Sequence, residues 1–300
     1  MPSSIHCPIS SSLTIMAATT TVDRQAAPAP AGAGDIADFN VADMALYGLQ
    51  RARQRLDALE SKSHWELADT ASFDCMHYLG DAALHAAAKA IHLQPGARVI
   101  DIGAGFSATG RFLHKNYGAD VTGVELQPEI HDMADTITAR NGLSAHVRSV
   151  NGDFTQLAAP EQPVDHILSF LCILHIPDRA AVFGKAASML REGGTMYLED
   201  FFARGGALDE TTSQQLRDIV SCPYLPSKER YVADLEAAGF GNVTFEDMTA
   251  DWAEFVHGRA AEYKQSTAPE PLLLTFYNTV DELFHKGQLG GARIMATKME

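Results

Sequence analysis

A glycine-containing stretch, VIDIGAGFSATG at residues 99–110, has the residue types of a ligand-binding turn. Two apolar residues lead into Asp101, and glycines follow at positions 103 and 105. Glycine lets the backbone approach a ligand closely, because no Cβ intervenes. In open α/β sheets, ligands bind beyond the carboxyl ends of the strands. The stretch therefore predicts a nucleotide-type site at Asp101, Gly103, Ala104 and Gly105.

Two interpretations of this turn predict different ligands. With Ala108, the segment GAGFSA satisfies the loose dinucleotide fingerprint GxGxx(G/A), which favours an NAD(P)-binding oxidoreductase. Asp101 favours the other interpretation, since a carboxylate beside the ligand repels a pyrophosphate and suits an ammonium group. A nucleoside that carries an amino acid therefore fits this turn better than a dinucleotide does.

Further acidic residues fit the same ligand. Glu125 ends the next expected strand, and its two oxygens can accept hydrogen bonds from both ribose hydroxyls. Asp153, in NGDF after the third expected strand, can accept a hydrogen bond from an adenine amino group, with Phe154 beside the ring. Each acid also has a structural interpretation, as a turn cap, a solvated strand end or an ordinary turn residue. The other expected binding residues are Leu126, Ser169 and Tyr78.

Histidines are the candidates for acid–base chemistry. His175 follows the fourth expected strand, and the ordinary pKa of histidine lies near working pH, as a general base requires. The alternative is a structural hydrogen bond to the backbone ahead of Pro177. His77 and Tyr78 precede the first strand, where they form either a second wall of the site or ordinary loop packing. The histidines show no grouping such as HExxH, so no metal site is expected.

Strand and helix patterns alternate from residue 97 onward. This alternation predicts a parallel sheet with helices on both faces. We expect strands at 97–102, 120–126, 146–154, 164–174, 195–201, 242–248 and 290–299. We expect helices at 41–60, 81–92, 109–118, 127–142, 178–191 and 225–239, and a largely helical insertion at 249–287.

The first 35 residues differ from the rest in composition. They are rich in Ala, Ser, Thr and Pro, with Asp23, Arg24 and Asp35 as their only charges, which predicts disorder. The alternative is a plastid or mitochondrial transit peptide, for which one arginine is few. Residues 36–300 are expected to form a single domain with a helical cap at 36–95, and a cytoplasmic location is the default expectation.

Composition excludes several classes of partner. The chain has 38 acidic and 23 basic residues, a net charge of −15, which argues against a nucleic-acid partner. Its four cysteines include no CxxC pair, so a disulfide framework is not expected. No apolar run reaches the ~18–20 residues of a membrane span. A small molecule is the expected partner, and the oligomeric state stays open.

The motifs occur in the order of a known family. They are VIDIGAG, VTGVEL, NGDF, VDHILSFLCILHI and LREGGTMYLED. This order resembles the class I S-adenosylmethionine-dependent methyltransferases. The resemblance implies a Rossmann-like α/β fold with a seven-stranded, mostly parallel sheet, helices on both faces and a helical insertion before the last strand. It also implies S-adenosyl-L-methionine as cofactor. Ser107 stands where the family often has a third glycine.

A closer resemblance is carried by ILHIPDRAAVFGKAASMLREGGTMYLEDFF, by Pro226 with Tyr231 and by DMTADW. These segments are similar to the phosphoethanolamine N-methyltransferases, whose catalytic histidine falls on His175. Positions that bind the phosphobase in that family are apolar in this chain, at Phe170, Leu171, Phe201, Val220 and Cys222. We therefore expect N-methylation of a small amine that carries no phosphate. The alternatives are an oxygen, sulfur or carbon acceptor, an NAD(P)-dependent oxidoreductase, and a non-catalytic scaffold.

Overall fold

The computed structural model describes residues 49–75, 77–266 and 271–300. The first helix in this part is α1 (Leu49–Leu59), so only part of the helix expected at 41–60 falls within it. The expectations for residues 1–35, disorder or a transit peptide, lie outside the described residues.

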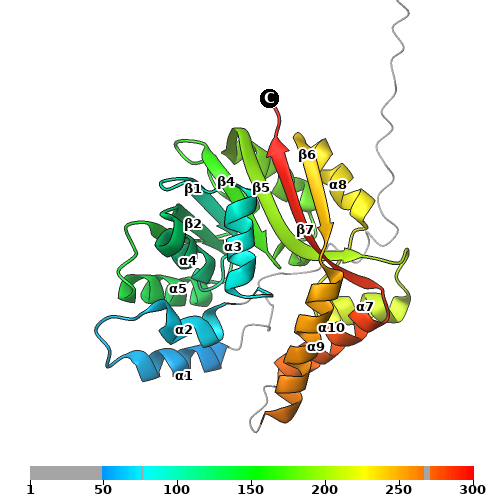
Figure 1. Cartoon of the computed structure of the whole chain (residues 1–300), viewed down its shortest axis with the longest axis horizontal. Coiled ribbons are helices and arrows are strands. Elements are labelled where there is room, and N and C mark those ends of the chain that lie inside the picture. Colours follow the sequence, from blue (N-terminus) through cyan, green and yellow to red (C-terminus); the bar gives the residue numbers. More distant parts are fainter. Residues whose placement is uncertain (1–48, 76, 267–270) are drawn as a thin grey trace, which may run out of the picture. The chain divides into compact units, whose positions relative to one another are not determined.

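Seven strands of the described chain form one sheet in the order β3-β2-β1-β4-β5-β7-β6 (Figure 1). β1 pairs in parallel with β2 and β4, β2 with β3, and β4 with β5. β7 runs antiparallel to both β5 and β6. The expected seven-stranded, mostly parallel sheet is confirmed. The strands are β1 (Arg98–Ile102), β2 (Asp120–Glu125), β3 (Val147–Asn151), β4 (Val164–Phe170), β5 (Leu190–Ala203), β6 (Phe240–Asp247) and β7 (Leu289–Lys298).

Helices connect the strands, and α4 and α5 end at the glycines that the sequence indicated as helix ends. Gly118 caps α4 with a left-handed φ of 71°, and Gly142 adopts the same φ just beyond α5. Two helices were not expected, α2 and α7, because their sequences LADTASFD and ETTSQQLRD lack an apolar repeat. The remaining helices are α2 (Leu67–Asp74), α3 (Asp81–Ala90), α4 (Ala108–Tyr117), α5 (Pro128–Arg140), α6 (Arg179–Met189), α7 (Glu210–Asp218), α8 (Lys228–Ala237), α9 (Thr249–Gln265) and α10 (Pro271–His285).

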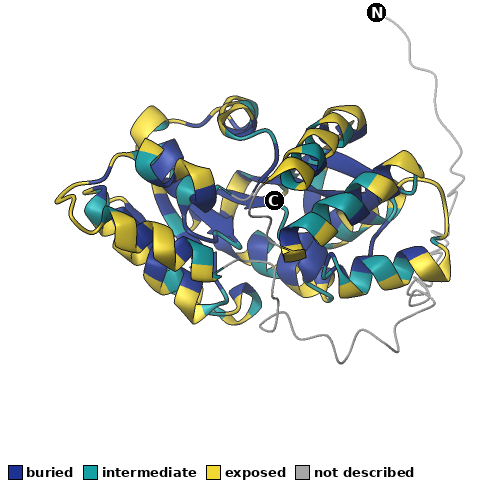
Figure 2. Cartoon of the chain, turned by 90° about the horizontal axis from the view of Figure 1, so that it is seen from below, coloured by how far each residue is buried: buried dark blue, intermediate teal, exposed yellow. Residues whose placement is uncertain are grey.

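The sheet is buried on both faces because successive strand side chains point in opposite directions. In β1, Val99 packs in the cluster built with α3 and α4, whereas Ile100 packs in the cluster built with α6 and α8. Figure 2 shows the result as buried strands between helices whose outer surfaces are exposed. This packing fixes the carboxyl ends of β1, β2 and β4, from which the candidate binding residues project.

A third apolar cluster connects the insertion to the sheet. Trp252 of α9 lies with its ring centroid 5.1 Å from that of Tyr78 and 5.8 Å from that of Phe201 in β5. Gly291 of β7 makes room for the indole, because a Cβ there would lie 2.3 Å from a ring carbon of Trp252. This packing holds α9 and α10 beyond the carboxyl-terminal ends of the parallel strands (Figure 1).

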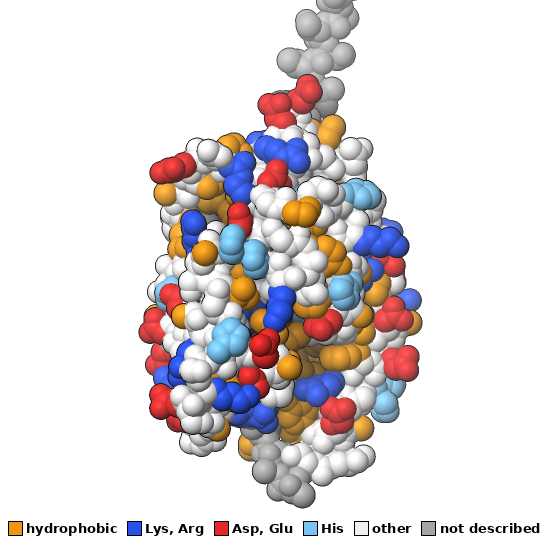
Figure 3. Space-filling model, turned by 60° about the vertical axis from the view of Figure 1, so that its left-hand side comes forward, with side chains coloured by type: hydrophobic (Ala, Val, Ile, Leu, Met, Phe, Trp, Pro, Cys, Tyr) orange, Lys and Arg blue, Asp and Glu red, His pale blue; other side chains and the backbone are white. Residues whose placement is uncertain are grey.

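The surface offers no single-sign patch on the face seen in Figure 3, where acidic and basic side chains are interspersed. Among the described residues, none of the helices combines the length and the apolar character that crossing a bilayer requires.

The packing of Trp252 on Gly291 predicts a stability difference between two glycine substitutions. Gly291→Ala forces a methyl group into the indole and should lower the free energy of unfolding by about 1–3 kcal/mol. The control is Gly258→Ala in α9, where a Cβ meets nothing within 4 Å, and which should raise stability by about 0.5–1 kcal/mol. Urea unfolding followed by circular dichroism measures both. Equal stability of the two variants would contradict this packing.

Candidate functional site

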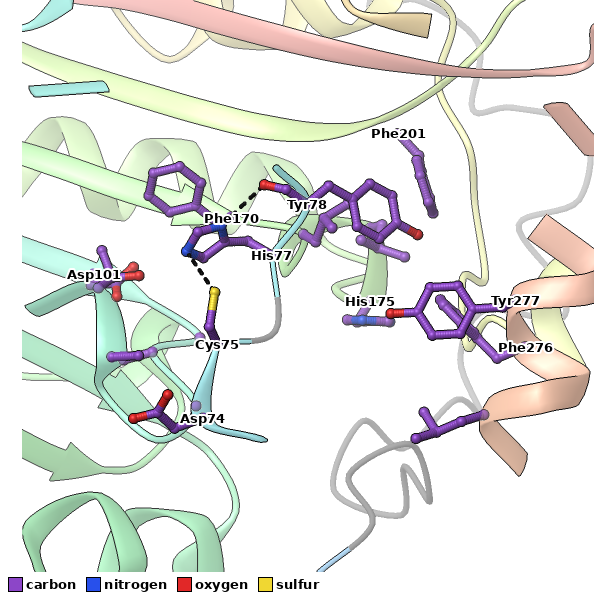
Figure 4. A pocket seen from close by; sticks show the side chains of 18 residues that line it. Asp74, Cys75, His77, Tyr78, Asp101, Phe170, His175, Phe201, Phe276 and Tyr277 are labelled. Carbon is purple, nitrogen blue, oxygen red and sulfur yellow. Dashed lines mark hydrogen bonds between the residues drawn. The ribbon is translucent and has the colours of Figure 1, made fainter. Parts of the chain in front are cut away.

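A pocket lies at the carboxyl ends of β1 and β4 (Figure 4). Five segments line it: the β1–α4 turn with the start of α4, the residues between α2 and α3, the end of β4 with the turn after it, β5 and α10. The lining residues are Asp74, Cys75, His77, Tyr78, Asp101, Gly103, Ala104, Gly105, Ala108, Thr109, Phe170, Leu171, Leu174, His175, Phe201, Leu273, Phe276 and Tyr277.

The β1–α4 turn needs both of its glycines, for different reasons. Gly103 has a φ of +70°, and a Cβ there would lie 2.2 Å from the Cys172 sulfur. Gly105 has a φ of +53°, and a Cβ there would meet no atom within 4 Å. The first glycine therefore packs against the protein, and the second exposes backbone to open space in the pocket.

Glu125 braces the same turn from the end of β2. One carboxylate oxygen accepts a hydrogen bond from the Gly105 N–H at 2.9 Å, and the other accepts from the Gln127 N–H at 2.8 Å. Burial raises the pKa of Glu125, and these backbone donors oppose that rise. Asn151 was not expected to contribute, yet its side-chain amide donates to the carbonyls of Glu125 and Leu126. It thereby fixes the position of the β2 terminus.

Asp101 is fully buried at the end of β1, on the floor of the pocket. Burial raises its pKa to about 8, and the negative charge of Glu125 adds to the rise. The raised pKa shows that this position disfavours an unpaired negative charge. A cation bound beside it would restore the charge, because opposite charge favours the ionised form.

His175 lies at the turn after β4, with its ring nearly buried. Its Nδ1 lies 2.8 Å from the Ser221 backbone oxygen, and a carbonyl only accepts, so Nδ1 carries the proton. Nε2 is then an acceptor. Burial lowers the pKa of His175 to about 4, so the expectation of a pKa near neutrality is wrong.

The segment before α3 forms another wall. His77 Nδ1 donates to the Tyr78 backbone oxygen at 3.2 Å, and its Nε2 lies 3.4 Å from the Cys75 sulfur (Figure 4). The His77 ring packs on Phe170, with centroids 5.1 Å apart. The Tyr78 hydroxyl is buried and has no hydrogen-bond partner among the described residues. Such a group suits a site where a ligand supplies the missing partner.

α10 closes the pocket with Leu273, Phe276 and Tyr277. Tyr277 stacks on Tyr263 of α9 with centroids 5.2 Å apart, and the Arg259 guanidinium lies 5.7 Å from the Tyr277 ring centre. The insertion aromatics therefore have two roles that the sequence left open. Trp252 and Phe284 are core residues, whereas Phe276 and Tyr277 face the pocket.

Several predicted binding residues do not line the pocket. Glu125 reaches it only through the Gly105 backbone, and Ser169 donates to the Ile102 carbonyl at 3.2 Å. Asp153 is exposed and accepts from the Thr155 N–H and hydroxyl. Phe154 is buried in the core. These side chains, with half-buried Leu126, border the strand ends without entering the cavity.

A buried ion pair connects the N-terminal cap to the binding turn. The Arg111 guanidinium of α4 donates to the Asp74 carboxylate of α2 at 2.7 Å, and Thr70 donates to the same oxygen. Arg111 also donates to the Phe106 carbonyl in the turn and to Thr138 of α5. Sequence inspection missed this network, because an arginine within a helical pattern normally indicates an exposed face.

Strained backbone gathers around the site. Leu79, Ser107, Leu171 and Ser221 all have φ between 51° and 61°, a region that costs non-glycine residues free energy. Ser107 is the position where the related family often has glycine, and its conformation explains that preference. Leu171 lines the pocket, and Ser221 supplies the carbonyl that orients His175.

No lysine or arginine is among the residues that line the pocket. The nearby buried cation Arg179 pairs with Asp200 at 3.6 Å and lies 5.2 Å from the Tyr231 ring centre. Its amino group also donates to the Tyr224 carbonyl at 3.0 Å. Phe170, Leu171 and Phe201 do form the pocket wall, whereas Val220 and Cys222 are buried behind it.

Comparison with known proteins gives the class of this architecture. The sheet topology is that of the Rossmann-like class I methyltransferases. Residues 99–194 match the family model described as "Methyltransferase domain". The resemblance inferred from the motifs is confirmed for the domain and the fold.

Two curated proteins with similar sequences are methyltransferases of known name. A glycine/sarcosine/dimethylglycine N-methyltransferase from Actinopolyspora halophila is 27% identical over 180 residues, covering 60% of this chain and 32% of that protein. A sterol 24-C-methyltransferase from Yarrowia lipolytica is 26% identical over 204 residues, covering 63% of this chain and 53% of that protein. The chain therefore spans about a third to a half of these curated relatives.

A solved structure supports the fold. Haemonchus contortus phosphoethanolamine N-methyltransferase 2, in complex with phosphomonomethylethanolamine and S-adenosylhomocysteine, has a TM-score of 0.72. The match has 18% sequence identity and covers 87% of this chain and 60% of that one.

The contacts of His175 predict its titration. With a pKa of about 4, the ring should stay neutral and keep its proton on Nδ1 from pH 5.5 to 8.5. Two-bond ¹H–¹⁵N NMR spectra, assigned by comparison with His175→Gln, measure both properties. A titration midpoint between pH 6 and 7, or a proton on Nε2, would contradict the burial and the hydrogen bond to Ser221.

Proposed function

We propose that this chain is an S-adenosylmethionine-dependent methyltransferase that acts on a small amine. One observation carries the proposal: a single pocket joins the glycine turn and Asp101 to His175 and an aromatic wall. A donor site and an acceptor site in one cavity are what direct transfer between two small molecules requires, because orientation supplies much of the rate enhancement.

The residues of the turn fit the methyl donor. Gly105 offers backbone to open space, and buried Asp101 has no cationic partner among the described residues. We assign Asp101, Gly103, Ala104 and Gly105 to the amino-acid portion and Glu125 with Leu126 to the ribose. Asp153, Phe154 and Ser169 border the base, and Tyr78 covers the donor from the opposite wall. The donor supplies a methyl group on a sulfonium.

The lining selects against phosphorylated acceptors. Its ionisable groups include Asp74 and Asp101, and no lysine or arginine. A phosphate moved into this wall would lose its hydration without gaining a cationic partner, at a cost of several kcal/mol. Aromatic faces attract ammonium groups by cation–π interaction, and Tyr78, Phe201, Phe276 and Tyr277 provide them.

In this proposal, His175 binds and orients the methyl acceptor. Its Nε2 accepts a hydrogen bond at neutral pH, so it orients an acceptor N–H toward the donor side of the pocket. Because burial lowers its pKa, the ring binds a proton weakly before transfer. It is therefore an orienting acceptor first, and a proton acceptor only once positive charge develops on the substrate nitrogen.

The donor assignment predicts the effect of Glu125→Ala. The substitution removes one charge-assisted hydrogen-bond acceptor and the brace on Gly105, so affinity for S-adenosylhomocysteine should fall about tenfold or more. Isothermal titration calorimetry measures it, with Glu236→Ala on the exposed face of α8 as the control acid. Unchanged affinity in Glu125→Ala would refute the assignment. Tighter binding of NADH than of S-adenosylhomocysteine would favour an oxidoreductase instead.

The acceptor assignment predicts a substrate order. With labelled donor, small unphosphorylated amines should be methylated faster than phosphoethanolamine. His175→Ala should reduce turnover about 10²-fold while donor affinity changes less than twofold. Efficient methylation of phosphoethanolamine would overturn the exclusion of phosphate. Full activity of His175→Ala, or turnover only with apolar sterol-like or quinol substrates, would replace the amine with an acceptor that needs no base at this position.

A further inference from the structure

Two imidazoles and a carboxylate converge on the outer side of the helical hairpin. His257 projects from α9, and Asp281 and His285 project from α10 one helical turn apart. Their ligand-type atoms all lie within 4.8 Å of one another. This cluster, the α9–α10 triad, is separate from the pocket residues that the proposed function uses.

The distances within the triad suit a metal ion. His257 Nδ1 lies 3.3 Å from each carboxylate oxygen of Asp281, and His285 Nδ1 lies 3.2 Å from one of them. Donor atoms around a tetrahedral ion with bonds of ~2.0–2.1 Å are separated by roughly 3.3 Å. Two of the three ligand-to-ligand distances that such a site requires are therefore already present, namely those from each imidazole nitrogen to the Asp281 carboxylate.

The third distance, between the nitrogens of His257 and His285, can reach the required value without disturbing the core. The His257 and His285 side chains are 65% and 64% exposed, so their rings can rotate, whereas the Asp281 carboxylate between them is 14% exposed. Metal binding replaces the hydrogen bonds that the two rings make, from His257 Nδ1 to the Asp281 carboxylate and from His285 Nδ1 to the Asp281 backbone oxygen, the latter at 2.8 Å.

A second group of the same composition, His114, Asp120 and His146, is less suitable. Its two imidazole rings are stacked, with centroids 4.1 Å apart and planes inclined by 14°. Stacked rings point their nitrogen lone pairs along parallel directions instead of toward a common point. His114 Nδ1 is also engaged with the Ala119 carbonyl at 2.8 Å.

We propose that the α9–α10 triad of His257, Asp281 and His285 binds a divalent transition-metal ion of the Zn²⁺ type. Two nitrogen ligands and one oxygen ligand favour such ions over Mg²⁺ or Ca²⁺, which take oxygen ligands. The ion joins α9 to α10 one turn beyond Tyr277. It therefore braces the helix that supplies Phe276 and Tyr277 to the pocket wall.

The test uses the full chain, freed of any affinity tag. Zn²⁺ titrated calorimetrically should bind with a micromolar dissociation constant, and Co²⁺ should give a visible absorption band. His257→Ala, His285→Ala and Asp281→Asn should each weaken that binding at least about 30-fold. The matched control, His114→Ala with His146→Ala, should leave it unchanged. Zn²⁺ at 100 times its dissociation constant should raise the Tm by about 5 °C.

Each contrary result overturns the proposal. These results are dissociation constants weaker than 1 mM for both ions, equal affinity in the three triad variants, or loss of binding only in the His114/His146 variant. The Tm of every variant in EDTA shows whether it folds. The Zn²⁺-induced Tm shift of the unsubstituted chain tests the site without any substitution.

Discussion

The buried ion pair between Asp74 and Arg111 is the contact on which the arrangement of the site depends. Each side chain is at most 5% exposed, and their partners come from α2, the binding turn and α5. Removing one partner of such a pair leaves an uncompensated buried charge, which typically costs about 3–5 kcal/mol. The pair connects α2 to α4, and Cys75, His77 and Tyr78, which follow α2, share one cavity with the glycine turn.

The electrostatics of the cavity follow from which charges are already paired. Arg111 and Arg179 are buried near it, but Asp74 and Asp200 neutralise them. Of the two carboxyl groups that line the cavity, Asp101 has no ion-pair partner among the described residues, and burial raises its pKa to about 8. This arrangement supports the proposal of a ligand that brings its own positive charge and carries no phosphate.

Much of the fold was predictable because it depends on local pattern. The alternation of apolar segments identified the seven strands, and Gly118 and Asn141–Gly142 marked the helix ends. α2 and α7 were missed, since tertiary contacts rather than an apolar repeat stabilise them. Strand β5 begins at Leu190, five residues before the expected position, because an irregular pairing with β4 extends it through two glycines.

By itself, the sequence determined the glycine turn after β1, the acid that ends β2 and the position of His175 after β4. These features are encoded within a few residues, where steric rules and strand periodicity decide the structure. Only the tertiary structure decided which side chains share the cavity. Arg111 meets Asp74 across 37 residues, and His175 meets Ser221 across 46. It also decided that the pKa of His175 is lowered and that of Asp101 is raised. The pKa of a buried group depends on desolvation, which is set when distant segments pack and exclude water.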